Sequence, residues 1–229
     1  MSEWLTFWNT DHALYVSERH KDAHQKLILS NILVWVPSGD ARIVDFGCAE
    51  ARYAEVLAQQ CGELILCEPA DRIRQMLKSR LQSVPTCSVV DGEELRRLPA
   101  SSVDLFVVNS VAQYLTQGEL QDWLGVWRSL AKPGGRLVLA DIVPHETSAL
   151  SDAVQLLAFA AREKFLIAAF SGLVATFFSP YRSTRKKLGL AAYSEAEIRA
   201  NLDAAGWRSC KMVKNFGHSR TRFAVTAVA

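Results

Sequence analysis

Asp45 and Glu68 are two acidic residues whose spacing is typical of a nucleoside site. Asp45 and Gly47 belong to the stretch IVDFGCAEA, where an apolar run gives way to a turn, and Glu68 ends the apolar run LILC, 21 positions after Gly47. At this spacing in an open parallel sheet, an acidic side chain on the neighbouring strand accepts hydrogen bonds from ribose hydroxyls. The two residues therefore predict a nucleoside-binding site at the carboxyl ends of two adjacent strands.

The turn after Asp45 contains a further carboxylate, Glu50, close to the start of the expected helix. A carboxylate here disfavours a pyrophosphate, whereas a cofactor with a positive sulfonium and no phosphate would be attracted. The alternative is that Glu50 only complements the helix dipole. Ala49 and Ala51 stand where such turns usually carry glycine. A positive φ at Ala49 would cost about 1 kcal/mol. If the ligand must approach the backbone closely here, the methyl group of the alanine would narrow the pocket.

The elements that must position these residues alternate regularly along the chain. Strands are predicted at 42–46, 64–67, 86–89, 103–109 and 136–142, with amphipathic helical stretches between them, and a helix before the last one is expected to stop at Pro133. Ser194 and Glu197 have the spacing of a capping box. Two further runs, 209–213 and 222–228, predict a closing strand pair. Near-continuous apolar strands separated by helices favour a parallel sheet covered on both faces.

With these motifs the chain resembles the class I S-adenosylmethionine-dependent methyltransferases. VDFGCAEA aligns with the pattern D-x-G-x-G-x-G, LILCEPA with a second strand ending in an acid, and LAKPGGRLVLAD with the fifth-strand motif. VVDGEELRRLPASSVDLFVVNSVAQYL resembles the stretch with the adenine-side acid and the fourth strand. The resemblance covers roughly residues 40–142. It implies an α/β, Rossmann-like, doubly wound fold, whose mostly parallel seven-stranded sheet has helices on both faces and an antiparallel terminal strand pair.

The resemblance also implies S-adenosyl-L-methionine as the cofactor, with a role for each matching position. Asp45 and Gly47 would line the methionine end, Glu68 would hold the ribose, and Asn109 would lie under the methionine moiety. Cys48 is interpreted as a small buried filler of the turn. The full set of expected cofactor-binding residues is Asp45, Gly47, Cys48, Ala49, Glu68, Pro69, Asp91, Gly92, Asn109 and Ser110, with Asp91 and Gly92 at the adenine.

We expect a single domain over residues 1–229, with residues 1–40 as an N-terminal helical lid and 145–190 as a helical insertion or cap. The lid is rich in hydrogen-bonding groups. Tyr15, His20 and Asp141 are the candidate catalytic residues, and Tyr15, Arg19, His20, Gln113, Tyr114 and His145 the candidate substrate-binding residues. His20 could instead lie on an exposed helical face. Tyr114 and Gln113 could be a core Tyr and a surface Gln, and Asp141 a loop residue that satisfies backbone amides.

His20 and His24 are four residues apart on an expected helix, which is the spacing of a metal-binding pair. No Glu follows His20 and no third ligand is evident, so no metal is expected.

The apolar stretch FLIAAFSGLVATFF, residues 165–178, lies inside the expected cap. It is shorter than the roughly 20 residues that a spanning helix needs. Burial in the core or cap is the default interpretation. The sharper one is an apolar acceptor site beside the basic residues Arg182, Arg185, Lys186 and Lys187, with a peripheral membrane contact or a homodimer contact through 165–187 as the alternatives.

Composition narrows the function further. Lys and Arg total 26 against 24 Asp and Glu, and this balance with the lack of a target-recognition domain argues against nucleic acid as a partner. Five cysteines without a C-x-x-C pair and a start without a signal pattern predict a reducing, cytoplasmic setting. The sequence thus predicts a methyltransferase for a small, apolar or lipid-like acceptor, methylating O or N and less readily C. The alternative is a methyltransferase-like binding or scaffold protein with weakened cofactor affinity. A nicotinamide-dependent oxidoreductase is disfavoured by the carboxylate in the turn.

Overall fold

The computed structural model describes residues 3–9, 15–177 and 189–229. Within these residues seven strands form one sheet in the order β3-β2-β1-β4-β5-β7-β6. The strands are β1 (Arg42–Phe46), β2 (Glu63–Cys67), β3 (Cys87–Val90), β4 (Val103–Asn109), β5 (Ala131–Ile142), β6 (Arg208–Val213) and β7 (Phe223–Val228). The first five strands run parallel, and β7 is antiparallel to both β5 and β6. The predicted α/β sheet with an antiparallel terminal pair is confirmed.

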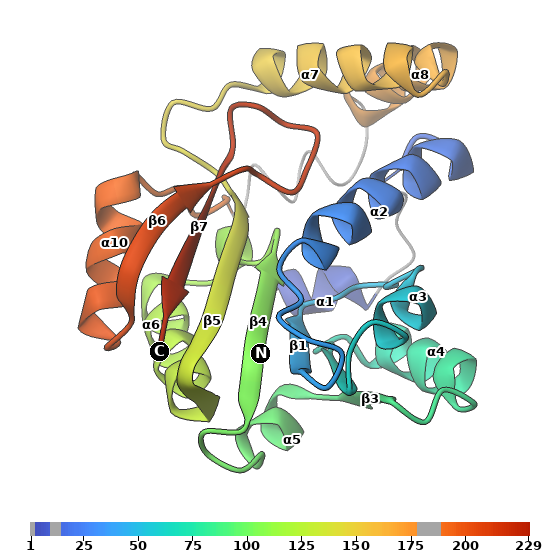
Figure 1. The fold of residues 1–229 in the computed structure, drawn as a ribbon. Coiled ribbons are helices and arrows are strands. Elements are labelled where there is room, and N and C mark those ends of the chain that lie inside the picture. Colours follow the sequence, from blue (N-terminus) through green and yellow to red (C-terminus); the bar gives the residue numbers. More distant parts are fainter. Residues whose placement is uncertain (1–2, 10–14, 178–188) are drawn as a thin grey trace.

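Helices cover both faces of this sheet, as predicted (Figure 1). On one face α2 (Glu18–Leu33), α3 (Ala54–Ala58) and α4 (Asp71–Leu81) pack their apolar side chains against β1 and β2. On the other face lie α5 (Gly92–Arg96), α6 (Gln117–Leu130) and α10 (Glu195–Ala204). The central strands are buried on both sides because these crossover helices exclude water from both faces. The carboxyl ends of β1, β2, β4 and β5 therefore meet at one edge.

Reciprocal caps fix the starts of three helices, α5, α6 and α10. In each, the N-cap side chain accepts from the amide three residues on, and the Glu there accepts from the N-cap amide. The capping box predicted for Ser194 and Glu197 is confirmed, while those at Asp91 and Thr116 were not predicted. Each satisfies two backbone donors that a helix start would leave without partners.

Two predicted details are wrong at the boundary between α6 and β5. The helix ends at Leu130, not at Pro133, because Ala131 already pairs with Val103 of β4. Strand β5 consequently begins five residues earlier than predicted. Gly135 is required in this strand, since a Cβ there would lie 2.9 Å from the carbonyl oxygen of Val103.

The region after β5 forms α7 (Ala149–Arg162) and α8 (Leu166–Phe177), which lie beyond the carboxyl edge of the sheet and near α2 (Figure 1). Phe159, Ala160, Phe165 and Ala169 form a small core of their own, against which residues of α2 pack. The outer side is apolar and exposed: Ile167 is 89% and Phe170 66% accessible. The apolar helices α7 and α8 are thus buried on their inner side only. The basic residues at 182–187 lie outside the described residues.

No helix among the described residues combines the length and the apolarity needed to cross a membrane.

Candidate active site

A cavity of about 590 Å³ opens at the carboxyl ends of β1, β2, β4 and β5, under α2 and the short helix α1 (Glu3–Trp8). All the residues expected to bind the cofactor line it except Asp91, and so do Tyr15, His20, Gln113, Tyr114 and Asp141. Parallel strands end at one edge of the sheet, which explains how residues from distant parts of the sequence meet there.

The turn after β1 adopts the backbone conformation that glycine favours. Gly47, Ala49 and Ala51 have φ angles of 71°, 49° and 36°, so both alanines occupy the left-handed region that L-residues rarely adopt. Arg80 of α4 holds the turn by donating to the carbonyl oxygens of Glu50 (2.8 Å) and Ala51 (2.6 Å). The turn therefore keeps the expected shape without the expected glycines, at the cost of backbone strain.

Gly47 meets a second requirement of the turn. A Cβ at this position would lie 2.4 Å from Cγ2 of Val111, which follows β4. No such contact is tolerated in a packed interior. Glycine is thus needed at position 47 for two reasons: its φ is positive, and it lies close to Val111, just after the end of the neighbouring strand β4.

Glu68 stabilises the same turn. The residue is 5% exposed, and its carboxylate accepts hydrogen bonds from the amides of Ala49 and Ala70, each at 2.9 Å. Burial raises the pKa of Glu68 above its usual value. Burial, and then the neighbouring Glu68, raise the pKa of Asp45 to about 7. Two adjacent carboxyls on the cavity wall favour a cationic or hydroxyl-rich ligand.

Glu50 points elsewhere. It forms an ion pair with Lys21 of α2, and its side chain is about half exposed. The same contact joins the turn to the lid helix α2, whereas the cavity wall contains Gly47, Cys48, Ala49 and Ala51 from this turn.

Asp91 is the expected cofactor residue that does not line the cavity. Its Oδ1 accepts from the amide of Glu94 at 2.8 Å, as the N-cap of α5. The neighbouring Gly92 lines the wall instead, where a Cβ would come within 3.1 Å of the Trp123 ring. The structure gives Asp91 a capping role and leaves Gly92 and Trp123 at this end of the cavity.

Residues of α1 and α2, which belong to the segment expected to form a lid, line the cavity. In α1, Trp4 and Trp8 pack on Tyr114, with ring centroids 4.8 and 5.5 Å apart. Directly after α1, the Asn9 side chain accepts from the amide of Arg72 in α4 at 3.4 Å. Helix α1 thus bridges from the end of β4 to the start of α4. The two tryptophans were not predicted, since nothing in EWLTFW by itself indicates a partner.

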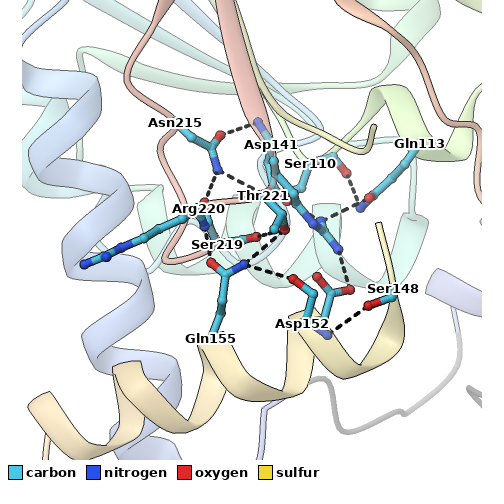
Figure 2. A network of polar contacts seen from close by, with 12 residues as sticks. Ser110, Gln113, Asp141, Ser148, Asp152, Gln155, Asn215, Ser219, Arg220 and Thr221 are labelled. Carbon is cyan, nitrogen blue, oxygen red and sulfur yellow. Dashed lines mark hydrogen bonds and ion pairs between the residues drawn. The ribbon is translucent and has the colours of Figure 1, made fainter. Parts of the chain in front are cut away.

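Asp141 belongs to a buried polar network at the end of β5 (Figure 2). Its Oδ2 accepts from Ser110 Oγ and from Arg222 Nη1, each at 2.7 Å, and its amide donates to Asn215 Oδ1 at 2.8 Å. Arg222 also donates to Gln113 Oε1 at 3.2 Å. These contacts leave Asp141 as a residue that orders the cavity wall. Arg222 was predicted only as part of a strand, because its partner is 81 residues away.

Two other predicted residues lie outside the cavity. Arg19 donates from Nε to the carbonyl of Glu163 at 2.7 Å, joining α2 to the segment between α7 and α8. His145 Nε2 lies 2.7 Å from Glu197 Oε2, at the start of α10. Both are exposed. For His145, the reason is that the chain leaves β5 toward α7 before it reaches this residue.

A set of rings lines the end of the cavity near β5 and β7. Tyr15, His20 and His24 come from the lid and His218 from the segment between β6 and β7. Burial lowers the pKa of His20 and of His24 to about 4, with His218 as a smaller cause in each case. His24 and His218 were not predicted as site residues, and the His-x-x-x-His spacing was the only available signal. No group of three His, Cys, Asp or Glu residues in the described ranges is placed to hold a metal ion.

Comparison with known proteins agrees with this arrangement. Residues 44–139 match the family described as "Methyltransferase domain". Among solved structures, the chain is similar to a SAM-dependent methyltransferase from Aquifex aeolicus, with 16% identity, a TM-score of 0.58, and 94% of this chain and 99% of the other covered. It is also similar to magnesium protoporphyrin IX methyltransferase from Synechocystis PCC 6803 with bound SAH, with 17% identity, a TM-score of 0.59, and coverage of 98% and 92%. At these identities the solved structures support the fold alone.

A comparison with curated protein sequences gave no match. The family match runs from within β1 to within β5 and includes the turn, Glu68 and the end of β4. Residues 44–139 of the chain are thus similar to the methyltransferase domain.

Proposed function

We propose that the protein transfers the methyl group of S-adenosylmethionine to an oxygen or nitrogen of a small, apolar acceptor. The observation that carries this proposal is one continuous cavity with two unlike ends. The end at β1 and β2 contains Asp45, Glu68 and Gly92, and the end near β5 and β7 contains Tyr15, His20 and Asp141. A transferase needs such adjoining sites to align its two substrates.

The residues at the β1 and β2 end fit the cofactor chemically. Among the described residues on the cavity wall, Arg222 is the side chain with a permanent positive charge, and Asp141 neutralises it. A pyrophosphate would therefore meet carboxyls without a compensating cation. Asp45 and Glu68 suit ribose hydroxyls and an ammonium or sulfonium group, and Asn109 and Ser110 suit the methionine moiety. When bound, the cofactor would supply a methyl group attached to a cationic sulfur, and this sulfur would be a good leaving group. The relative from Synechocystis PCC 6803 has also been solved with bound SAM.

The lid residues would bind and orient the acceptor. The hydroxyl of Tyr15 accepts from Gln25 Nε2 at 3.2 Å, and burial raises the pKa of Tyr15, so this hydroxyl stays protonated. Gln113 and Tyr114 line the wall between the two ends. Covering the cavity with α1 and α2 excludes water, which strengthens every polar contact to the acceptor.

A second candidate function is binding without catalysis, in a protein whose cofactor affinity has been weakened. Two observations favour it: Ala49 and Ala51 are strained, and both carboxylate oxygens of Glu68 already accept backbone hydrogen bonds. Titration calorimetry with S-adenosylmethionine distinguishes the two. Saturable heat together with a rise in the melting temperature supports the methyltransferase, whereas neither signal at millimolar ligand would leave the binding protein as the better account.

The contact predicted through residues 165–187 stays a prediction. The exposed apolar side chains of α8, Leu166, Ile167 and Phe170, are compatible with a membrane surface and with a second copy of the chain.

A further inference from the structure

His24 and His218 lie side by side at the end of the cavity that the proposed function assigns to the acceptor. Their Nδ1 atoms are 3.4 Å apart and their ring centroids 5.5 Å apart. One comes from the lid helix α2 and the other from the segment that joins β6 to β7, so only the folded chain brings them together. Both line the cavity.

The protein holds His218 in place from several sides. Its ring stacks on Phe159 of α7, with centroids 4.9 Å apart and an angle of 13°. The segment around it is fixed by Asn215, which donates to the carbonyl of Ser219 at 3.1 Å and accepts from the amide of Asp141. Figure 2 shows how this network continues through Thr221 and Gln155 into α7. A side chain so constrained by rings and hydrogen bonds is preorganised.

The arrangement of hydrogen atoms in the pair leaves one ring nitrogen able to take a proton. A neutral imidazole has one donor and one acceptor nitrogen. Where two rings meet through their Nδ1 atoms, one Nδ1 donates and the other accepts. The donating ring then has its lone pair on Nε2. Burial keeps both rings neutral at neutral pH, because it lowers the pKa of His24 to about 4 and also lowers that of His218.

The order of the strands places this pair beyond the reacting end of the cofactor. Glu68 follows β2 and would hold the ribose, whereas Asn109 ends β4 and Ser110 follows it, in the middle of the sheet. The methionine side of the cofactor would therefore point toward β4 and β5, and the histidines follow on the side of β7. An acceptor atom between the methionine side of the cofactor and the two histidines would lie within reach of the cofactor and of the histidine pair.

The walls at this end favour a flat, aromatic acceptor. Tyr15 lies edge-on to His20 and His24, with centroids 5.1 and 5.7 Å apart, and His20 stacks on Phe165 at 4.8 Å. Aromatic rings prefer such edge-to-face and stacked neighbours. The acidity of the acceptor hydroxyl also favours an aromatic compound. A phenol with a pKa of about 10 gives its proton to an imidazole far more easily than an aliphatic alcohol does.

We propose, on the basis of the proposed function, that the acceptor is an aromatic hydroxyl compound and that the His24 and His218 pair takes its proton. A ring nitrogen of the pair takes the hydroxyl proton as the oxygen forms its bond to the methyl carbon. The bond between carbon and sulfur breaks, and its electron pair stays on sulfur. The pair is left with one positive charge, which Asp141 stabilises and Arg222 opposes, and it then returns the proton to solvent.

The test uses two probes of similar shape, 4-methylphenol and 4-nitrophenol, with the full chain and S-adenosylmethionine in mildly alkaline buffer. In this buffer 4-nitrophenol is already ionised and needs no base, whereas 4-methylphenol does. His24→Asn and His218→Asn should each slow methylation of 4-methylphenol by about a hundredfold and leave that of 4-nitrophenol nearly unchanged. Lys211→Asn, at an exposed position of β6 in the same strand pair, is the matched control and should change neither rate.

A second measurement does not depend on turnover. In the complex with S-adenosylhomocysteine, the ring ¹⁵N signals of His24 and His218, assigned from the two variants, should shift when 4-methylphenol is added. Unchanged signals would overturn the proposal, and so would an equal loss of both rates in the variants, which indicates a structural role. A wild-type protein that binds the cofactor but methylates neither probe would exclude the aromatic hydroxyl acceptor. Failure to bind the cofactor at all would instead overturn the proposed function.

Discussion

Arg222 and Asp141 form a 2.7 Å ion pair that joins the start of β7 to the end of β5, and their side chains are only 15% and 12% exposed. The pair lies at the wall of the cavity and also contacts Ser110 and Gln113. It connects β7 with the end of β5 and, through Ser110 and Gln113, with the segment after β4.

Replacing Arg222 by Met should destabilise the protein strongly. Removing one partner of a buried ion pair leaves the other charge without compensation, which costs about 3 kcal/mol. Urea unfolding measures this cost. Lys78→Met is a control, since the pair of Lys78 and Glu94 is half exposed and 4.0 Å long, and its loss should cost less than about 1 kcal/mol. Equal costs for the two variants would show that the buried pair has no special role.

Ala49→Gly should stabilise the protein slightly. Glycine adopts the left-handed conformation without the roughly 1–2 kcal/mol of strain that alanine has there, while the more flexible unfolded chain offsets about half of this gain. A gain of up to about 1 kcal/mol in the free energy of unfolding is expected. Ala200→Gly in α10, an exposed helical position, should instead lose about 1 kcal/mol. Ala49→Gly also tests the cofactor site. We expect a modest change in its affinity for S-adenosylmethionine, and a large gain would show that the native turn impairs binding.

Cofactor affinity should increase with pH around neutrality because of Asp45. Its pKa is about 7 in the free protein, and a cationic cofactor favours the ionised carboxylate, so binding releases a proton when Asp45 starts protonated. Affinity should therefore rise by up to about tenfold per pH unit as pH increases toward about 7, and level off above this value. Calorimetry in buffers of different ionisation enthalpy measures the proton release. An Asp45→Asn variant with the same pH dependence would assign the effect to another group.

Protein stability should fall on the acid side of neutrality because of His20. Its pKa is lowered to about 4 in the folded protein, against about 6.5 in the unfolded chain. The unfolded state thus binds more protons between these values, and stability is lost as pH falls from about 6.5 to about 4. His20→Phe keeps the ring stacked on Phe165 and removes the titration. Its unfolding free energy should depend less steeply on pH than that of the wild type, and equal slopes would contradict the assignment.

Local sequence patterns predicted most of the fold. Strands such as 42–46 and 103–109 were found with the predicted bounds, because their continuous apolar runs can be buried only in the middle of a sheet. The capping box at Ser194 was predicted for a similar reason, since its donors and acceptors lie within four residues. The end of α6 was wrong because pairing of Ala131 with Val103, a distant residue, outweighed the local pattern.

By itself the sequence determined the class of fold, the methyltransferase motifs and the acidic residues Asp45 and Glu68, because each depends on spacing within one strand, turn or helix. Only the tertiary structure decided that Arg19 and His145 lie outside the cavity, and that His24 meets His218 across 194 residues. Contacts between distant segments depend on the packing of whole helices and strands, and no short pattern specifies them.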